Sequence, residues 1–251
     1  MGIILSLLIL CVIIFIHEGG HYLAMRRYGV DVKEFSIGMG PLLWSTRLAN
    51  GTQFSIRCLP IGGYAMPVTP IEQLDLRPWP RFVIYVAGMF VNATAAFVGL
   101  VFHYSFSSDT TVYSLGSILL AAAVMSYGLW LATPVLVVKM VVENGIMSFF
   151  KEASGPIGII DMGQRMTTQS PSVAFGILFF FCVINVGLAG INALPLYPFD
   201  GGRIAGLFLE KISGSHKEKV IKYYTLITTA MTLFLILTII GSDIIKLIFK
   251  T

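Results

Sequence analysis

Long apolar runs alternate with short polar segments along the whole chain. Four runs reach the roughly 20 mostly apolar residues that a membrane-spanning helix needs, and they cover about residues 2–24, 80–104, 172–194 and 224–249. A fifth run, about 112–142, is long enough but has Pro134 in its middle. The pattern predicts a polytopic α-helical membrane protein with about four transmembrane helices and one extra interfacial or re-entrant helical stretch.

Residues 33–68 interrupt this helical pattern. Glycines and prolines punctuate the segment, and "ANGTQ" is typical of a turn between two strand-like runs, "LLWSTRL" and "QFSIRCL". We therefore expect a β-hairpin or small sheet that is associated with the membrane on its cytoplasmic side.

The basic residues predict an orientation. Lys and Arg are concentrated in residues 26–81 and 203–222, whereas residues 103–111 contain none. Because basic loops stay in the cytoplasm, the N-terminus is expected outside the cell (inner) membrane. Residues 112–142 must then cross an even number of times, by lying in the outer interface or by entering and returning at Pro134. The first 25 residues lack the basic start of a signal peptide, so a retained first span is expected.

Composition supports the bilayer as the solvent of this protein. Of its 251 residues, 56% are hydrophobic and 12% are charged, whereas a soluble domain carries roughly 25% charged residues. The net charge of +4 does not indicate nucleic acid as a partner, because the basic residues lie in short stretches between apolar runs. The three cysteines include no CxxC pair, so no disulfide framework is indicated.

The first apolar run carries candidate chemistry. Its "HEGGH" places His17 and His21 four residues apart, so on a helix the two imidazoles lie one turn apart on one face. This spacing suits two ligands of one zinc ion, with Glu18 beside the first ligand as general base for the attacking water. Ionisable groups within a membrane span mark functional sites. The alternative is an inert polar patch that is hydrogen-bonded between helices.

A catalytic zinc site takes three protein ligands. "INALPLYPFDGGR", residues 191–203, offers Asp200 at the cytoplasmic end of the predicted span 172–194. The first span also runs inward, so Asp200 and the two histidines can meet at similar depth. Two prolines interrupt a helix here, and the Gly-Gly pair permits a sharp turn. The alternative role of Asp200 is to cap the helix that follows.

These motifs resemble those of a known family. The chain is similar over nearly its whole length to the site-2 proteases, the intramembrane zinc metalloproteases of regulated intramembrane proteolysis. It is most similar to the bacterial type that cleaves membrane-anchored anti-sigma factors and remnant signal peptides. The matching elements are "HEGGH", the β segment "EFSIGMGPLLWSTR…GTQFSIRCLPIGGYAMP", "AGMFVNATAAF", "ASGPIGI" and "NVGLAGINALPLYPFDGGR".

The resemblance implies roles for individual residues. It implies that Asn192 lines the site and holds substrate backbone or the oxyanion, and that Asn92 has a supporting role in substrate binding. The metal centre that it implies consists of His17, His21 and Asp200 as ligands of one zinc ion, with Glu18 as the group that activates water.

The sequence departs from the family pattern in three places. Met89 stands where the family usually has proline, and Tyr197 occupies the commoner proline site before Pro198. Relatives with this layout usually carry PDZ domains after the second span, whereas here only residues 103–111 stand in that place. We therefore expect no PDZ domain, and no gating of substrates by one.

A substrate helix hides its peptide bonds, so a protease must unwind it locally. We expect the glycine-bearing strands to pair with the extended substrate by strand addition; the alternative is a structural hairpin that only plugs the cavity. The glycines concerned are Gly38, Gly40, Gly62 and Gly63.

The expected function is that of an intramembrane zinc endopeptidase. Its partners would be the lipid bilayer and single-span or signal-peptide-like membrane proteins, and nothing in the sequence specifies an oligomeric state. Two alternatives stay open: a membrane metal transporter, which would move metal ions without proteolysis, and a non-catalytic protein that binds transmembrane segments.

Overall fold

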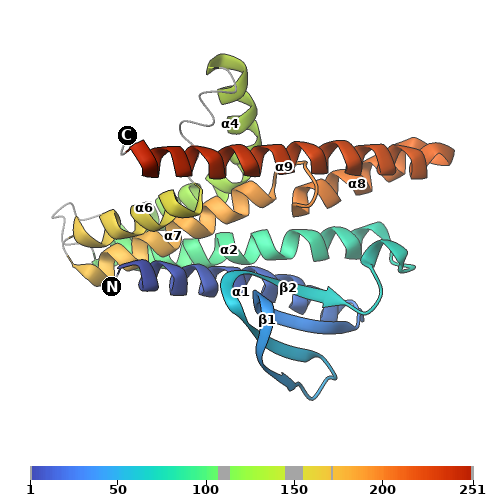
Figure 1. Cartoon of the computed structure of the whole chain (residues 1–251), viewed down its shortest axis with the longest axis horizontal. Coiled ribbons are helices and arrows are strands. Elements are labelled where there is room, and N and C mark those ends of the chain that lie inside the picture. The colour runs from blue at the N-terminus through green and yellow to red at the C-terminus, as the bar shows by residue number, and fades with distance from the viewer. Residues whose placement is uncertain (1, 107–113, 145–154, 171, 250–251) are drawn as a thin grey trace.

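The computed structural model describes residues 2–106, 114–144, 155–170 and 172–249, and it is largely helical (Figure 1). Five stretches are long and apolar enough to cross a membrane: Ile4–Arg27, Pro78–Phe106, Leu115–Met140, Val173–Asn192 and Asp200–Ile244. They include the four predicted spans and the fifth apolar run that the sequence pattern shows. The prediction of a helical membrane protein is therefore confirmed.

Helices α1, α2 and α9 extend beyond their apolar runs, whereas α7 is slightly shorter than its run. A π turn, η2 (Val124–Gly128), joins α3 to α4, and the described residues also form the 3-10 turns η1 (Ile71–Gln73) and η3 (Gly214–His216). The helices are α1 (Gly2–Arg27), α2 (Pro78–Phe106), α3 (Leu115–Ala123), α4 (Leu129–Asn144), α6 (Pro156–Thr168), α7 (Val173–Asn192), α8 (Asp200–Ser213) and α9 (Lys217–Phe249).

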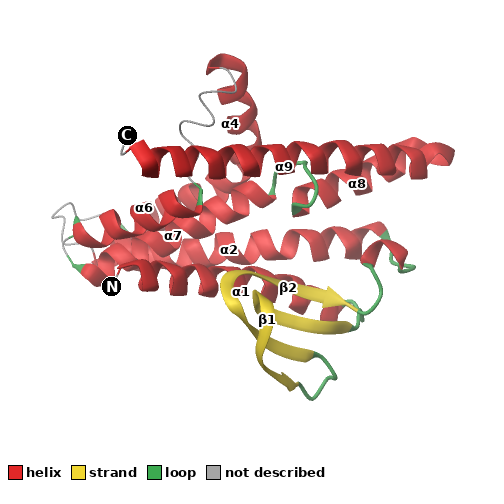
Figure 2. Cartoon of the chain, viewed as in Figure 1, coloured by secondary structure: helices red, strands yellow, loops and turns green. Residues whose placement is uncertain are grey.

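The predicted hairpin is present at the predicted residues, and its strands are longer than the two strand-like runs. Strands β1 (Val32–Arg47) and β2 (Gln53–Pro67) are antiparallel and lie on one flank of the bundle beside α1 (Figure 2). Both strands bend, so that residues 34–37 of β1 pair with residues 53–56 and also with residues 63–66 of β2. The last part of β2 pairs only with β1, so its other edge is open to further pairing.

Helices α2 and α7 form the centre of the bundle, with α1 against α2 and α6 against both α7 and α1. Helices α1, α2, α7 and α9 alternate in direction along the long axis of Figure 1. An apolar cluster packs the sheet and η1 against the end of α1 and the start of α2; its buried members are Met25, Val30, Val32, Ile71, Ile84 and Tyr85.

The end of α2 and the start of α7 lie at the same end of the bundle. The ring of His103 on α2 lies 5.4 Å from the ring of Phe175 and 5.1 Å from that of Phe179 on α7. The chain between them therefore ends at the level where it starts, as the charge argument requires. Residues 112–113, at the start of the predicted fifth run, and residues 145–154, which follow that run, lie outside the described residues.

A reversal at Pro134, one of the two predicted paths, is wrong. Helix α4 continues through Pro134, and the irregular turn lies at η2 instead. A proline removes one helical hydrogen bond and kinks a helix, but it does not force the chain to turn back. Helix α6 was not predicted as a separate element.

The two basic segments meet at one end of the bundle, which we call the basic end: the end of α1, the start of α2 and helix α8. Arg81 of α2 donates two hydrogen bonds to the Glu210 carboxylate of α8, at 2.7 and 3.0 Å. The positive-inside argument places both segments on one side of the membrane, and their contact agrees with that.

The far half of α9 is attached to α6 through a buried carboxylate. Asp243, only 4% exposed, accepts hydrogen bonds from the amides of Gly155 and Gly158 at 3.3 Å each. The first amides of a helix have no partner within it, and a Cβ at Gly155 would collide with Asp243. Asp243 therefore caps α6 from a different helix.

The sheet carries its own partly buried ion pair. The Arg57 guanidinium donates to the Glu34 carboxylate at 2.8 Å and to the Gly40 carbonyl at 2.8 Å. Burial opposes ionisation of Glu34, but hydrogen bonds from Ser55, Arg57 and Tyr64 outweigh it and lower the pKa of Glu34. The ion pair therefore stabilises the bend of the sheet only while Glu34 is charged.

Replacing Asp243 with leucine should destabilise the protein by about 1–3 kcal/mol, because buried amides of α6 would lose their acceptor. The thermal unfolding of the detergent-solubilised protein measures this change. The matched variant Asp243→Asn keeps one acceptor oxygen and should lose less. Unfolding temperatures equal to the wild type in both variants would contradict the proposed cap.

Glu34→Gln should make the protein less sensitive to acid. Because the pKa of Glu34 is lowered by folding, its contribution is present above the unfolded value of about 4.3 and is lost as the pH falls through the folded value. The variant should lose less than about 1 kcal/mol at neutral pH and show a smaller fall in unfolding temperature between about pH 6 and pH 3. Asp31→Asn, at a pair whose carboxylate is 80% exposed, is the control. An unchanged acid profile in Glu34→Gln would refute this role.

Candidate metal centre and active site

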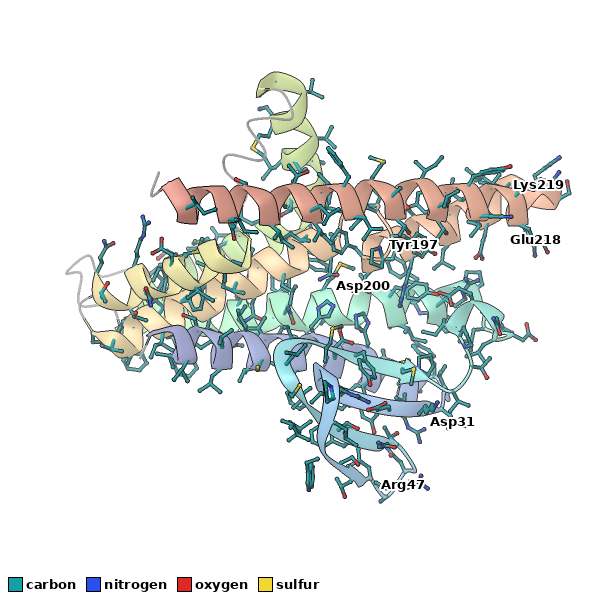
Figure 3. The ribbon with its side chains drawn as sticks, viewed as in Figure 1. Asp31, Arg47, Tyr197, Asp200, Glu218 and Lys219 are labelled. Atoms are coloured by element: carbon teal, nitrogen blue, oxygen red, sulfur yellow. The ribbon has the colours of Figure 1, made fainter. Side chains whose placement is uncertain are left out.

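Helices α1 and α8 bring three potential metal ligands together. The Nε2 atoms of His17 and His21 lie 3.2 Å apart, and they lie 3.2 and 3.1 Å from Oδ2 of Asp200. His17 is 5% and Asp200 6% exposed, so this cluster lies inside the bundle. Figure 3 shows Asp200 at the start of α8, on the side that faces α2. The predicted meeting of the three residues is therefore present.

The spacing of the three atoms fits zinc. Ligand atoms that each lie about 2.0–2.1 Å from a tetrahedral zinc ion lie about 3.3 Å from one another. The three observed separations fall close to this value. Two imidazoles and one carboxylate are also a donor set that zinc accepts while one position stays open for water or substrate.

The imidazole of His21 is oriented by the backbone of α2. Its Nδ1 lies 2.7 Å from the carbonyl oxygen of Ile84, so Nδ1 carries the proton and the lone pair of Nε2 points into the cluster. A side chain at Gly88 would collide with both imidazoles, and one at Gly20 of α1 would collide with the backbone of α2. The two glycines allow α1 and α2 to approach closely at the metal centre.

The loop between α7 and α8 delivers Asp200 to the histidines. Phe199 occupies the N-cap position of α8, and no side chain caps that helix. The alternative that Asp200 acts as an N-cap is therefore wrong, because its carboxylate contacts the two imidazoles instead. A Cβ at Gly201 or Gly202 would collide with the backbone of residues 193–197, so the two glycines let this loop fold against the first turn of α8.

Helix α9 holds the same loop from the other side. Tyr197 donates its amide hydrogen to Thr228 at 3.2 Å and accepts a hydrogen bond from Thr232 at 2.7 Å. Tyr224 donates to the carbonyl of Pro195 at 2.8 Å. A proline at position 197 would have no amide hydrogen. Tyr197, which replaces the proline common in the family, therefore allows the hydrogen bond that attaches the loop to α9.

Glu18 contacts the open edge of the sheet. Its Oε2 accepts a hydrogen bond from the backbone amide of Ala65 on β2 at 3.1 Å. Glu18 and the three potential ligands line one open cavity of about 730 Å³, together with residues 63–67 of β2, Val68 and Asn192. The general base, the metal centre and a strand edge therefore face the same space.

The remaining predicted site residues divide into two groups. Asn192 lines the cavity, and its Nδ2 donates to the Leu188 carbonyl at 3.0 Å. Gly63 also lines it. Asn92 is fully buried between helices and is not among the lining residues, so its position gives no support to direct substrate binding.

The other three glycines serve the backbone of the sheet. Gly38, Gly40 and Gly62 have φ angles of 81°, 80° and 89°, which side chains disfavour, and they lie at the bends of the strands rather than along the cavity. Their assignment to substrate binding finds no support in their positions.

Sequence reasoning missed three backbone features of the site. These are the amide of Ala65, the carbonyl of Ile84 and the lack of a side chain at Gly88. Backbone amides and carbonyls leave no trace in a residue pattern. Only Gly88 had a signal, since it lies in the "AGMFVN" element.

Comparison with known proteins agrees with this geometry. A sequence profile of peptidase family M50 matches residues 5–236. A Nostoc protein, all3971, named as a candidate zinc metalloprotease, is 23% identical over 322 aligned positions that cover 85% of this chain and 87% of that protein. That alignment is longer than this chain, so the Nostoc protein has residues within it that lack a counterpart here.

Two further relatives match over a shorter part. A candidate zinc metalloprotease of Fusobacterium nucleatum is 38% identical over 39% of this chain and 31% of its own length. Zinc metalloprotease Rip1 of Mycobacterium tuberculosis is 32% identical over 39% of this chain and 27% of its own length.

The family match covers most of the chain, and the relatives are named as zinc metalloproteases. The apolar helices place the protein in a membrane, and zinc is the metal that both the family and the ligand geometry indicate. The chain therefore belongs to peptidase family M50, the site-2 protease family, and is a membrane-embedded zinc metalloprotease.

Proposed function

We propose that this protein is an intramembrane zinc endopeptidase, which hydrolyses peptide bonds within or near transmembrane segments of membrane-anchored proteins. The observation that carries the proposal is the shared cavity. Two histidines and an aspartate at zinc spacing, a glutamate beside them and an open strand edge all line it. The cavity is open and carries these ionisable side chains, so water for hydrolysis can enter it.

The proposed ligands of zinc are His17, His21 and Asp200. Bound there, zinc supplies a Lewis acid that polarises the peptide carbonyl. The Glu18 carboxylate removes a proton from the attacking water and passes it to the nitrogen of the leaving amine. Asn192 uses one amide hydrogen on the Leu188 carbonyl and keeps a second for the developing oxyanion.

The edge of β2 provides a place for an unwound substrate. Residues 63–67 line the cavity and pair with β1 on one side only. An extended substrate that pairs with the other side regains main-chain hydrogen bonds lost when its helix unwinds. The Ala65 amide points to this side, because it donates to Glu18.

The substrate classes and orientation follow from the resemblance and the charge pattern. We propose anti-sigma factors or remnant signal peptides as substrates, as single-span partners in the cell (inner) membrane. The N-terminus lies outside, and the active site faces the cytoplasmic side because it lies toward the basic end. Glu218 and Lys219, at the start of α9, lie at that end of the bundle (Figure 3).

Glu18→Gln should bind zinc as the wild type does but lower cleavage by at least about 10²–10⁴-fold, the usual contribution of a general base. The purified protein is incubated with a panel of single-span substrates, with and without chelator, and zinc is counted by elemental analysis. Glu143→Gln, at an exposed pair on α4, is the matched control.

Cleavage that persists in Glu18→Gln would refute the assignment of the base. Metal flux into liposomes without any proteolysis by the wild type would favour the metal transporter. Capture of substrates without cleavage by the wild type would favour the non-catalytic binder.

Ala65→Pro should lower cleavage of transmembrane substrates by about tenfold or more. The variant removes the edge amide that contacts Glu18, while proline is tolerated on an edge strand where the amide is not used by the ladder. Ala65→Gly keeps the amide and should retain most activity. Steady-state rates of both variants measure the effect, and equal rates for Ala65→Pro and the wild type would exclude a role for this amide.

A further inference from the structure

A layer of buried polar groups without partners lies beside the metal centre. In the described part of the chain, nine buried side-chain nitrogen or oxygen atoms have no hydrogen-bond partner. Five of them belong to only four residues, on α1, α2, α4 and α7: His17 Nδ1, Asn92 Nδ2 and Oδ1, Trp130 Nε1 and Asn185 Oδ1. Such groups are costly among apolar helices in a membrane, so we expect these groups to satisfy one another's hydrogen bonds.

Asn92 and Asn185 lie at the same level of the interface between α2 and α7. Both are 0% exposed, and both lie between the same two apolar clusters of this interface. Along α2, Asn92 lies between the cluster members Met89 and Ala96, and along the antiparallel α7, Asn185 lies between Ala189 and Cys182 of the same two clusters. The two amides are therefore at one level of the bundle, with Trp130 packed in the first cluster.

The same face of α2 leads to His17. A Cβ at Gly88 would meet Cε1 and Nε2 of the His17 ring, and Asn92 lies one helical turn further along that face. Helical side chains lean toward the N-terminal end of their helix, so Asn92 leans back over Gly88 toward this ring. The unpaired Nδ1 of His17 is the neighbouring polar atom of the ring.

The donors and acceptors of this layer complement one another. With Nε2 of His17 turned to the ligand cluster, Nδ1 carries a hydrogen to donate. Asn92 offers an acceptor oxygen and an amide that donates. Asn185 already donates to the Phe181 carbonyl at 2.8 Å, which leaves its Oδ1 free to accept.

We propose that Asn92 is a positioning residue of the metal centre, and that it fixes the His17 imidazole through a polar chain. The chain runs from His17 Nδ1–H to Asn92 Oδ1, and from Asn92 Nδ2–H to Asn185 Oδ1, with a water molecule as the bridge at each step, because none of these atoms has a direct partner among the described side chains. It ends at the Phe181 carbonyl. On this assignment Asn92 orients His17 in the way that the Ile84 carbonyl orients His21. Asn92 therefore acts on the metal centre rather than on the substrate.

Asn92→Leu should weaken zinc binding by about 10–100-fold, the usual effect of losing a partner behind a metal-binding histidine. Zinc affinity is measured on the intact, detergent-solubilised protein by competition with a chelator of known affinity. The visible spectrum of the cobalt-substituted protein should also change, because the His17 ring is no longer held. Neither measurement depends on proteolysis, so the result is separate from the proposed function.

Three further variants separate positioning from simple packing. Asn92→Asp keeps an acceptor for His17 and should retain zinc affinity within a few-fold. Asn185→Leu should weaken zinc less than Asn92→Leu, and the double variant should be no weaker than Asn92→Leu alone, since the chain is already broken. Ser126→Ala, which removes a buried hydroxyl bonded within its own helix, should leave zinc binding unchanged.

A folded Asn92→Leu protein with wild-type zinc affinity and an unchanged cobalt spectrum would overturn the proposal. Equal loss in Asn92→Asp and Asn92→Leu would overturn it as well. If Asn92→Leu does not fold, Asn185→Leu decides: reduced zinc affinity supports the chain, and wild-type affinity overturns it.

Discussion

The contact between two histidines and one aspartate inside a membrane-spanning bundle determines much of this structure. A carboxylate and two imidazoles are costly among apolar helices unless they bind a cation or one another. His17 and Asp200 are both buried, and they lie far apart in the chain but 3.2 Å apart in space. Their contact therefore joins the first helix to the last third of the protein.

Close approach of backbone is the condition for this contact. Gly88 gives α2 the room to lie against both imidazoles, and the carbonyl of Ile84 orients one of them. On the other side, α9 holds the loop between α7 and α8, which precedes Asp200, through hydrogen bonds to the backbone of that loop. The ligands are thus held by rigid helices on both sides, which suits a centre that must keep its geometry while substrates enter and leave.

The sheet contributes to the same site from outside the bundle. The amide of Ala65 lies at the open edge of β2 and donates to Glu18, so the strand edge and the proposed base are in direct contact. An extended substrate on this edge would lie beside the group that activates water. Substrate binding and catalysis would then share one short stretch of backbone, at the level where the bent sheet packs against α1.

The sequence by itself determined the class of the protein and the identity of the central residues. Apolar runs of membrane length predict spans because the bilayer leaves few alternatives, and "HEGGH" with "PFDGGR" names the candidate ligands and base from local spacing alone. Only the tertiary structure decided that Asp200 contacts the histidines instead of capping α8 and that the chain continues through Pro134. It likewise placed Asn92 among buried polar groups and made a backbone amide the partner of Glu18. These features depend on which helices approach each other and on where main-chain atoms point, and neither is encoded in the order of residue types along one segment.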